Sequence, residues 1–250
     1  MELGTVTRAL AILEILSKVR DANLETLAQQ TGLPKTTTLR LLTTLTENKY
    51  VVKDSHDRYY LSMKMFAVGS RALSHIDLID ISRPIARELS IATGETVHMG
   101  ILEENRALYV LKNESHYNIR MYSRIGRSCP LHSSAMGKCL MIDKDASFLD
   151  DYANSGELVS YTPKTISTKE ALAKELEKVR LQGYAVDDEE NEPQIVCVAA
   201  PIFDHEGKVV AAMSVSTPTF RLDDAKLKKN IGLVLEYTQK ISTILGNLGH

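Results

Sequence analysis

A pair of short helical segments, joined by a tight turn and followed by two β-prone runs, limits the folds that the first part of this chain can adopt. Apolar residues recur at spacings of three and four in three stretches, which predicts amphipathic helices. These stretches are residues 5–19, 24–30 and 35–48. Residues 31–34, Thr-Gly-Leu-Pro, separate the last two, because glycine favours a helix end and proline fits a helix start. Residues 50–53 and 59–62 then flank a polar tip and predict a hairpin.

Helix, turn, helix and hairpin in this order predict a winged helix-turn-helix, in which the third helix enters the DNA major groove. A helical wheel places Thr38, Leu41, Leu42 and Leu45 on one side. It places Thr36, Arg40, Thr43, Thr44 and Glu47 on the other. On that outward side, threonine methyls can touch thymine methyls, threonine hydroxyls can reach phosphates or base edges, and arginine can bind guanine. The predicted contacts to double-stranded DNA are Lys35, Thr36, Thr37, Arg40 and Thr44 on the helix and Lys53 and Arg58 on the hairpin.

The same residues also fit a surface helix of an ordinary helical bundle, with threonine and arginine simply solvated. Charge favours the DNA interpretation, because residues 1–75 hold 10 Lys and Arg against 7 Asp and Glu, whereas the remainder holds 20 against 25. We therefore expect a DNA-binding domain at residues 1–62, a linker helix at 63–77 and a second domain at 78–250.

Strand and helix patterns alternate irregularly in the second domain, which predicts a mixed α+β fold rather than a doubly wound sheet. The expected strands are residues 96–102, 107–113, 119–123, 184–186, 195–203 and 209–215. The expected helices are residues 78–93, 134–142, 144–152, 169–182 and 223–248. Pro84 must lie near the first turn of its helix or kink it.

The composition argues against several classes of protein. No run approaches the roughly 18 to 20 apolar residues of a membrane-spanning helix, and the first residues lack a secretion signal, so we expect a cytoplasmic protein with no membrane partner. The cysteines, Cys129, Cys139 and Cys197, form no even framework and are expected to be reduced. No cofactor is expected.

Five stretches resemble the IclR family of bacterial transcription factors in order and spacing. They are residues 24–45, 130–138, 183–190, 197–204 and 214–218. Residues 118–127 resemble the KdgR-like subgroup, which controls sugar-acid catabolism. The chain departs from the family at Thr38, where an apolar Val is usual, and at residues 193–196, where a Gly- and Arg-containing stretch is usual.

The resemblance implies a GAF-like or profilin-like effector domain and homodimers or homotetramers on a pseudo-palindromic operator. It also implies an effector pocket formed by Ala135, Met136, Asp187, Cys197, Ser214 and Ser216. Residues 133–138 are small and polar where a helix begins, so their N–H groups predict an anion site, although an ordinary N-capped helix fits equally. Ser214 and Ser216 share one strand face and can hold ligand oxygens. A small carboxylate or sugar-acid effector is therefore expected.

Three alternative sites stay open at this stage. Cys129, His132 and Cys139, with His98, are metal-capable, but their spacing is looser than structural zinc sites show, so no metal is expected. Residues 187–190 fit a solvated acidic turn better than an acid-base pair. A hydrolase would use Ser133 or Ser134 with His132, yet neighbouring residues rarely form a triad.

The sequence thus predicts a ligand-responsive, DNA-binding transcriptional regulator with no catalytic residues, repressing genes of carbohydrate or sugar-acid catabolism. The alternative is a hydrolase-like, metabolite-binding enzyme with an accessory DNA-binding domain.

Overall fold

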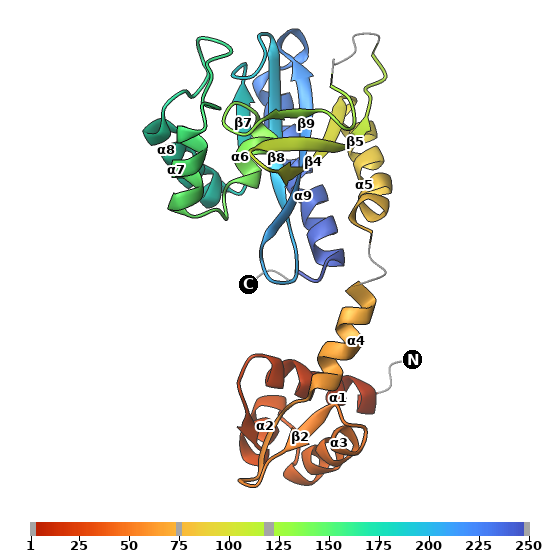
Figure 1. Cartoon of the computed structure of the whole chain (residues 1–250). Helices are drawn as coiled ribbons and strands as arrows, with labels where there is room; N and C mark the ends of the chain where they lie inside the picture. Colours follow the sequence, from red (N-terminus) through yellow and green to blue (C-terminus); the bar gives the residue numbers. More distant parts are fainter. Residues whose placement is uncertain (1–3, 74–76, 118–122, 248–250) are drawn as a thin grey trace. The chain divides into compact units, whose positions relative to one another are not determined.

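The computed structural model describes residues 4–73, 77–117 and 123–247 (Figure 1). The chain divides into two compact units, residues 1–76 and 77–250. No helix among the described residues is both long and apolar enough to cross a membrane.

The first unit packs short helices against a three-stranded antiparallel sheet of order β1-β3-β2. Its elements are α1 (Gly4–Ser17), β1 (Ala22–Asn23), α2 (Leu24–Thr31), α3 (Lys35–Glu47), β2 (Val51–Lys53), β3 (Arg58–Leu61) and α4 (Met63–Leu73). Ile12, Leu27 and Leu42 are fully buried and form one core with Val51 and Tyr59 of the hairpin. The predicted helix-turn-helix and hairpin are confirmed, and β1 is an addition too short to leave a pattern.

The turn between α2 and α3 forms for local reasons. The Asn23 side chain caps α2 by accepting a hydrogen bond from the Thr26 amide at 2.8 Å. Gly32 ends α2 in the left-handed region at φ 66°, which glycine adopts without strain. Thr38 is buried, and its hydroxyl donates to the Pro34 carbonyl at 3.2 Å, as expected for a polar residue in place of valine.

The second unit is an α+β domain around a six-stranded antiparallel sheet of order β6-β5-β4-β9-β8-β7, which confirms the predicted class. Its strands are β4 (Thr96–Glu103), β5 (Arg106–Asn113), β6 (Ser128–Pro130), β7 (Ala185–Asp188), β8 (Ile195–Phe203) and β9 (Val209–Pro218). Its helices are α5 (Leu78–Thr93), α6 (Ala135–Leu140), α7 (Ala146–Asn154), α8 (Lys169–Gln182) and α9 (Asp224–Ile244), with a 3-10 turn at Thr219–Arg221.

Pro84 lies inside α5, beyond its first turn, so the first of the two placements expected for it does not hold. Most of the strand expected at 119–123 falls outside the described residues, and β6, which is only three residues long, was not predicted.

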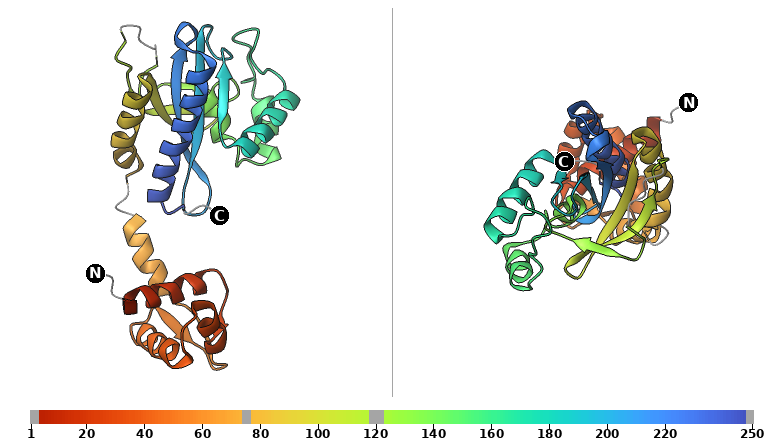
Figure 2. Two further views of the ribbon diagram at one scale, coloured as in Figure 1. Left: turned by 180° about the vertical axis from the view of Figure 1, so that it is seen from behind. Right: turned by 90° about the horizontal axis from the view of Figure 1, so that it is seen from above.

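Helices cover the two faces of this sheet differently. In the left view of Figure 2, α5 and α9 lie in front of the sheet, whereas α6 contacts β8 and β9 from the other face. Antiparallel register puts Asp187, Cys197 and Ser216 side by side across β7, β8 and β9. This row lies on the α6 face, because Met136 of α6 packs against Gly100, which shares that face of β4.

The start of α6 lies unusually close to the segment before it. A Cβ atom at Gly137 would lie 2.3 Å from the Cα of Leu131, so only glycine fits there. This close approach fixes the position of Ala135 and Met136 over the sheet.

Candidate functional sites

The surface of α3 carries the first candidate site. Lys35, Thr36, Arg40 and Thr44 are exposed and Thr37 is half-buried. Pro34 is the N-cap of this helix and supplies no side-chain hydrogen bond, in contrast to the caps of α2 and α6. The amides of the first turn therefore remain open to an anion such as a phosphate.

The threonines of α3 differ from what was expected of them. The Thr43 hydroxyl donates to the Leu39 carbonyl at 2.9 Å, and the Thr44 hydroxyl donates to the Arg40 carbonyl at 3.1 Å. Both hydroxyls are thus bonded to their own helix rather than held ready for base edges or phosphates. Because both hydroxyls are bonded to the helix, the methyl groups are the parts of Thr43 and Thr44 that remain for contact with a ligand.

Most of the predicted basic contacts are held by neighbouring carboxylates. Lys35 pairs with Glu25 at 2.8 Å, and Arg58 on β3 pairs with Asp21. Lys53 pairs with Asp57 at the hairpin tip. The Arg40 guanidinium has no hydrogen-bond or ion-pair partner in the part of the chain that the structure describes, so it is available to a ligand.

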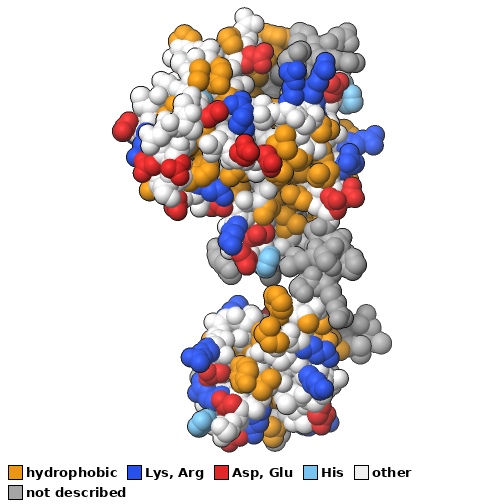
Figure 3. Space-filling model, in the orientation of Figure 1, with side chains coloured by type: hydrophobic (Ala, Val, Ile, Leu, Met, Phe, Trp, Pro, Cys, Tyr) orange, Lys and Arg blue, Asp and Glu red, His pale blue; other side chains and the backbone are white. Residues whose placement is uncertain are grey.

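Charge on the first unit is mixed rather than uniformly basic. Figure 3 shows basic and acidic side chains interspersed over the face that is drawn, which agrees with these ion pairs. The N-terminus of α3 and Arg40 therefore carry more of the attraction for a polyanion than a general basic field does.

The second candidate site is a polar cluster on the α6 face of the large sheet. The six predicted effector residues come together here, with Ala135 and Met136 on α6 and the others on β7, β8 and β9. Five of the six are buried, and Cys197 is half-buried.

A chain of polar contacts crosses this cluster from β8 to β4. The Cys197 thiol donates to the Ser216 hydroxyl at 3.2 Å. The Ser216 hydroxyl in turn lies 3.4 Å from Nδ1 of His98. Nε2 of His98 lies 2.7 Å from the Ser123 hydroxyl. The Ser214 hydroxyl forms no hydrogen bond with any residue that the structure describes, so of the two serines on β9 it is the one open to a ligand.

His98 and Tyr109 belong to this site although sequence reasoning did not place them there. Their rings lie 5.0 Å apart, and burial, with Lys112 second, lowers the pKa of His98 to about 3, so its imidazole is neutral. Burial raises the pKa of the Cys197 thiol, which suits a packing role better than a reactive one. His98 lies opposite Ser214 in the register of β4 against β9, and no pattern in the sequence marks that pairing.

Asp187 is the only carboxyl group predicted for the pocket, and it is buried. It accepts hydrogen bonds from the amides of Glu190 at 2.7 Å and Asn191 at 3.2 Å. Burial nevertheless dominates and raises the pKa of Asp187 to about 7. Near neutral pH this side chain therefore exists both as an acceptor and as a protonated donor.

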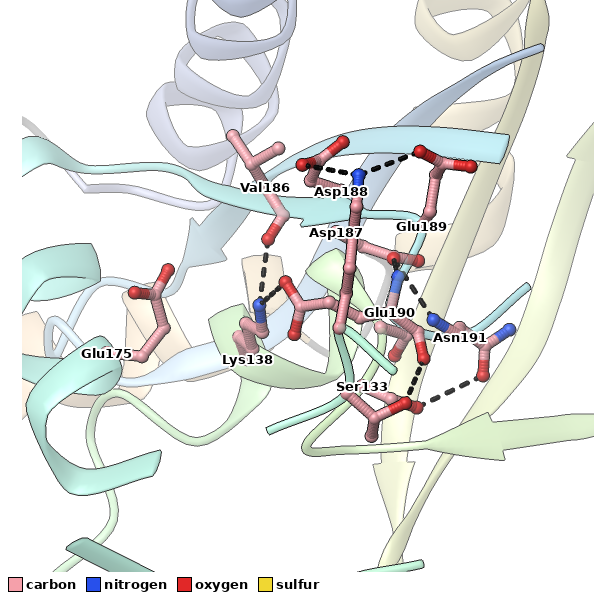
Figure 4. Close-up of polar contacts among 12 residues, drawn as sticks. Ser133, Lys138, Glu175, Val186, Asp187, Asp188, Glu189, Glu190 and Asn191 are labelled. Carbon is pink, nitrogen blue, oxygen red and sulfur yellow. Dashed lines mark hydrogen bonds and ion pairs between the residues drawn. The ribbon is translucent and has the colours of Figure 1, made fainter. Parts of the chain in front are cut away.

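Residues 187–190 are not the solvated acidic turn that was expected (Figure 4). Only Asp188 and Glu189 are solvated, and both pair with Lys164. Glu190 is buried and binds the fully buried Lys138 at 2.6 Å, and Lys138 also donates to the Val186 carbonyl at 2.8 Å. Burial raises the pKa of Glu190 despite this lysine. The pair ties α6 to the end of β7, which is the edge strand.

The start of α6 is capped, which is one of the two interpretations left open by its sequence. The Ser134 hydroxyl accepts a hydrogen bond from the Gly137 amide at 3.0 Å and donates to the Pro130 carbonyl at 2.6 Å. The capping leaves the amides of Ala135 and Met136 without a hydrogen-bond partner among the described residues, at the edge of the pocket.

The described residues do not form the metal site or the hydrolase site that the sequence left open. Among the described residues no three His, Cys, Asp or Glu side chains come together as metal ligands. His132 bonds to the Tyr152 hydroxyl at 2.8 Å and the Val159 carbonyl at 2.9 Å, so it activates no serine. Ser133 donates to Asn191 at 3.1 Å instead.

Two family models match the chain. The model described as the C-terminal part of bacterial IclR transcriptional regulators matches residues 70–243, and the IclR helix-turn-helix domain matches residues 5–55. The regulator KdgR of Escherichia coli K12 is 38% identical over 244 residues, covering 97% of this chain and 93% of its own length.

Solved structures have the same architecture. The IclR protein of Thermotoga maritima is 32% identical, with a TM-score of 0.65 over 98% of this chain and 100% of its own. A putative IclR-type regulator from Silicibacter sp. TM1040 has a TM-score of 0.87 at 24% identity, covering 98% of this chain and 96% of its own, which supports the fold alone.

Proposed function

Because the chain belongs to the IclR family, whose members are DNA-binding transcriptional regulators with an effector domain and not enzymes, we propose that it represses genes of carbohydrate or sugar-acid catabolism in response to a small carboxylate. Residues 1–62 bind a pseudo-palindromic operator, 63–77 link the two domains and 78–250 bind the effector. The protein acts in the cytoplasm as a homodimer or homotetramer.

The observation that carries the DNA-binding role is the exposed face of α3. This helix begins at Lys35 with no side-chain cap on its amides, and Arg40 in its second turn is exposed and has no partner among the residues that the structure describes. Uncapped amides suit a phosphate, and an arginine with free donors suits the paired acceptors of a guanine edge. We propose that Lys35, Thr36, Thr37, Arg40 and Thr44 contact DNA, with Lys53 and Arg58 on the hairpin against the backbone.

The effector proposal rests on the polar cluster over β7, β8 and β9. The open Ser214 hydroxyl, Ser216 and Asp187 can bind ligand hydroxyl and keto oxygens, while the amides of Ala135 and Met136 can meet a carboxylate. A small sugar acid or keto acid satisfies both sets of groups. The resemblance of residues 118–127 to the KdgR-like subgroup, which controls sugar-acid catabolism, favours this class of ligand.

Removing the two serine hydroxyls should weaken effector binding. We expect Ser214→Ala together with Ser216→Ala to lower affinity for a sugar acid at least tenfold, because each neutral hydrogen bond contributes about 0.5 to 1.5 kcal/mol and a buried ligand oxygen left without a partner costs about 1 to 3 kcal/mol. Calorimetric titration measures this, with DNA binding in the absence of ligand as the control that should not change. An unaltered affinity would place the ligand elsewhere.

Effector affinity should also fall as the pH rises from about 6 to about 8. Below its pKa of about 7 Asp187 is neutral and can donate to a ligand oxygen, whereas above it the carboxylate repels an anionic ligand. A sugar acid is ionised throughout this range, so the change belongs to the protein. Asp187→Asn should flatten the pH dependence, since the amide oxygen can still accept from Glu190 and Asn191. The same slope in wild type and variant would assign the titration to another group.

Selection of operator fragments from genomic DNA tests the function as a whole. The full chain should enrich pseudo-palindromic sites beside genes of sugar-acid metabolism, and a sugar acid should alter retention of these fragments. Turnover of the same ligands, followed by NMR, separates the enzyme alternative: a regulator leaves them unconsumed.

A further inference from the structure

One apolar side chain lies on the exposed face of α3 that is proposed to contact DNA and is otherwise polar. Leu39 precedes Arg40 and is 43% exposed, although leucine usually lies inside. It belongs to neither the buried side of the helix, formed by Leu41, Leu42 and Leu45, nor the set of DNA contacts proposed above.

Thr43 extends this apolar surface by one helical turn. Residues four apart lie on the same face of a helix, and the Thr43 hydroxyl is already bonded to the Leu39 carbonyl at 2.9 Å. Its methyl group therefore remains as the outward atom beside Leu39. The two residues border a hollow of about 260 Å³ between α3 and the hairpin, whose other walls include Tyr59 and Lys53.

Of the four bases, only thymine offers a methyl group in the major groove. The other base edges present hydrogen-bonding groups there, and these would lose water against Leu39 without gaining a partner. An apolar surface beside Arg40 can therefore favour thymine over the other three bases at the position next to the guanine that the arginine binds.

We infer that Leu39 and the Thr43 methyl group read the 5-methyl group of a thymine in each half-site of the operator. This inference rests on the proposed function, because it requires α3 to lie in the major groove. It assigns sequence preference to two residues that make no hydrogen bond to a base.

The test exchanges thymine for deoxyuridine, which removes only the methyl group. Selection from random DNA duplexes with the full chain first defines the site, and each thymine is then replaced in turn. At one position per half-site we expect about a fourfold loss of affinity, and about fifteenfold when both half-sites are changed. Thr43→Ser, which keeps the hydroxyl and its helix bond, and Leu39→Ala should bind the thymine and deoxyuridine sites more nearly alike.

Ile91→Ala is the matched control, because Ile91 is an apolar side chain in the second unit that is 61% exposed. It should keep the wild-type response to deoxyuridine, and thermal unfolding should report all variants as folded. If no thymine position responds, or if Leu39→Ala retains the full wild-type response, the inference is wrong while the regulatory function stands. Failure to select any site overturns the proposed function and this inference with it.

Discussion

Lys138→Met should lower the free energy of unfolding of the second unit by about 3 to 5 kcal/mol at neutral pH. Lys138 is fully buried and its partner Glu190 is 8% exposed, so removing the lysine leaves a buried carboxylate without its counter-charge. One oxygen of that carboxylate, Oε2, has no hydrogen-bond partner among the described residues even with Lys138 in place. Urea unfolding followed by circular dichroism measures the loss.

The pH dependence and a double variant distinguish this cause from lost packing. Without Lys138 the pKa of Glu190 should rise further, so the destabilisation should shrink as the pH falls and the carboxyl group becomes protonated. Lys138→Met with Glu190→Met should recover much of the loss, because an apolar pair needs no compensating charge. Lys164→Met, which breaks the solvated ion pairs with Asp188 and Glu189, should change little. A loss independent of pH and kept in the double variant would contradict this account.

Arg40→Ala should weaken specific operator binding by about 1 to 3 kcal/mol per half-site and relax the preference at one base position. The reason is that Arg40 is exposed on α3 and no described residue competes for its guanidinium. Fluorescence anisotropy with the selected operator and single-base variants of it measures both effects.

Lys35→Ala provides the contrast, because Lys35 stands at the start of α3 and is expected to meet phosphate. It should weaken all sequences alike and reduce the dependence of binding on salt, without altering base preference. If Arg40→Ala instead left affinity and selectivity unchanged, the proposed docking of α3 would be wrong.

The first unit was largely predictable because its determinants are local. Helical spacing, the Gly32 to Pro34 turn and the hairpin all lie within short stretches, so each leaves a pattern in the sequence. The hydroxyl bonds of Thr43 and Thr44 were not predictable, because a wheel gives the direction of a side chain but not its rotamer.

The pocket was predictable only through its resemblance to a family. Strand register brings His98 next to Ser214 and Ser216 across 116 and 118 residues of sequence, and no pattern in the chain encodes that pairing. The burial of Asp187 and Glu190 has the same origin, since α6 packs against β7 and its Lys138 binds Glu190. Four adjacent acidic residues look solvated until that helix is in place.

Operator binding by the full chain, measured with and without a sugar acid, tests whether the protein is a ligand-responsive regulator. We expect a selected pseudo-palindromic operator to bind in preference to random DNA, and its affinity to change when the acid is added but not when the corresponding uncharged alcohol is added. Ser214→Ala with Ser216→Ala should keep the operator affinity and lose the response. An operator affinity unaffected by any sugar acid, or affected equally by acid and alcohol, would contradict the account.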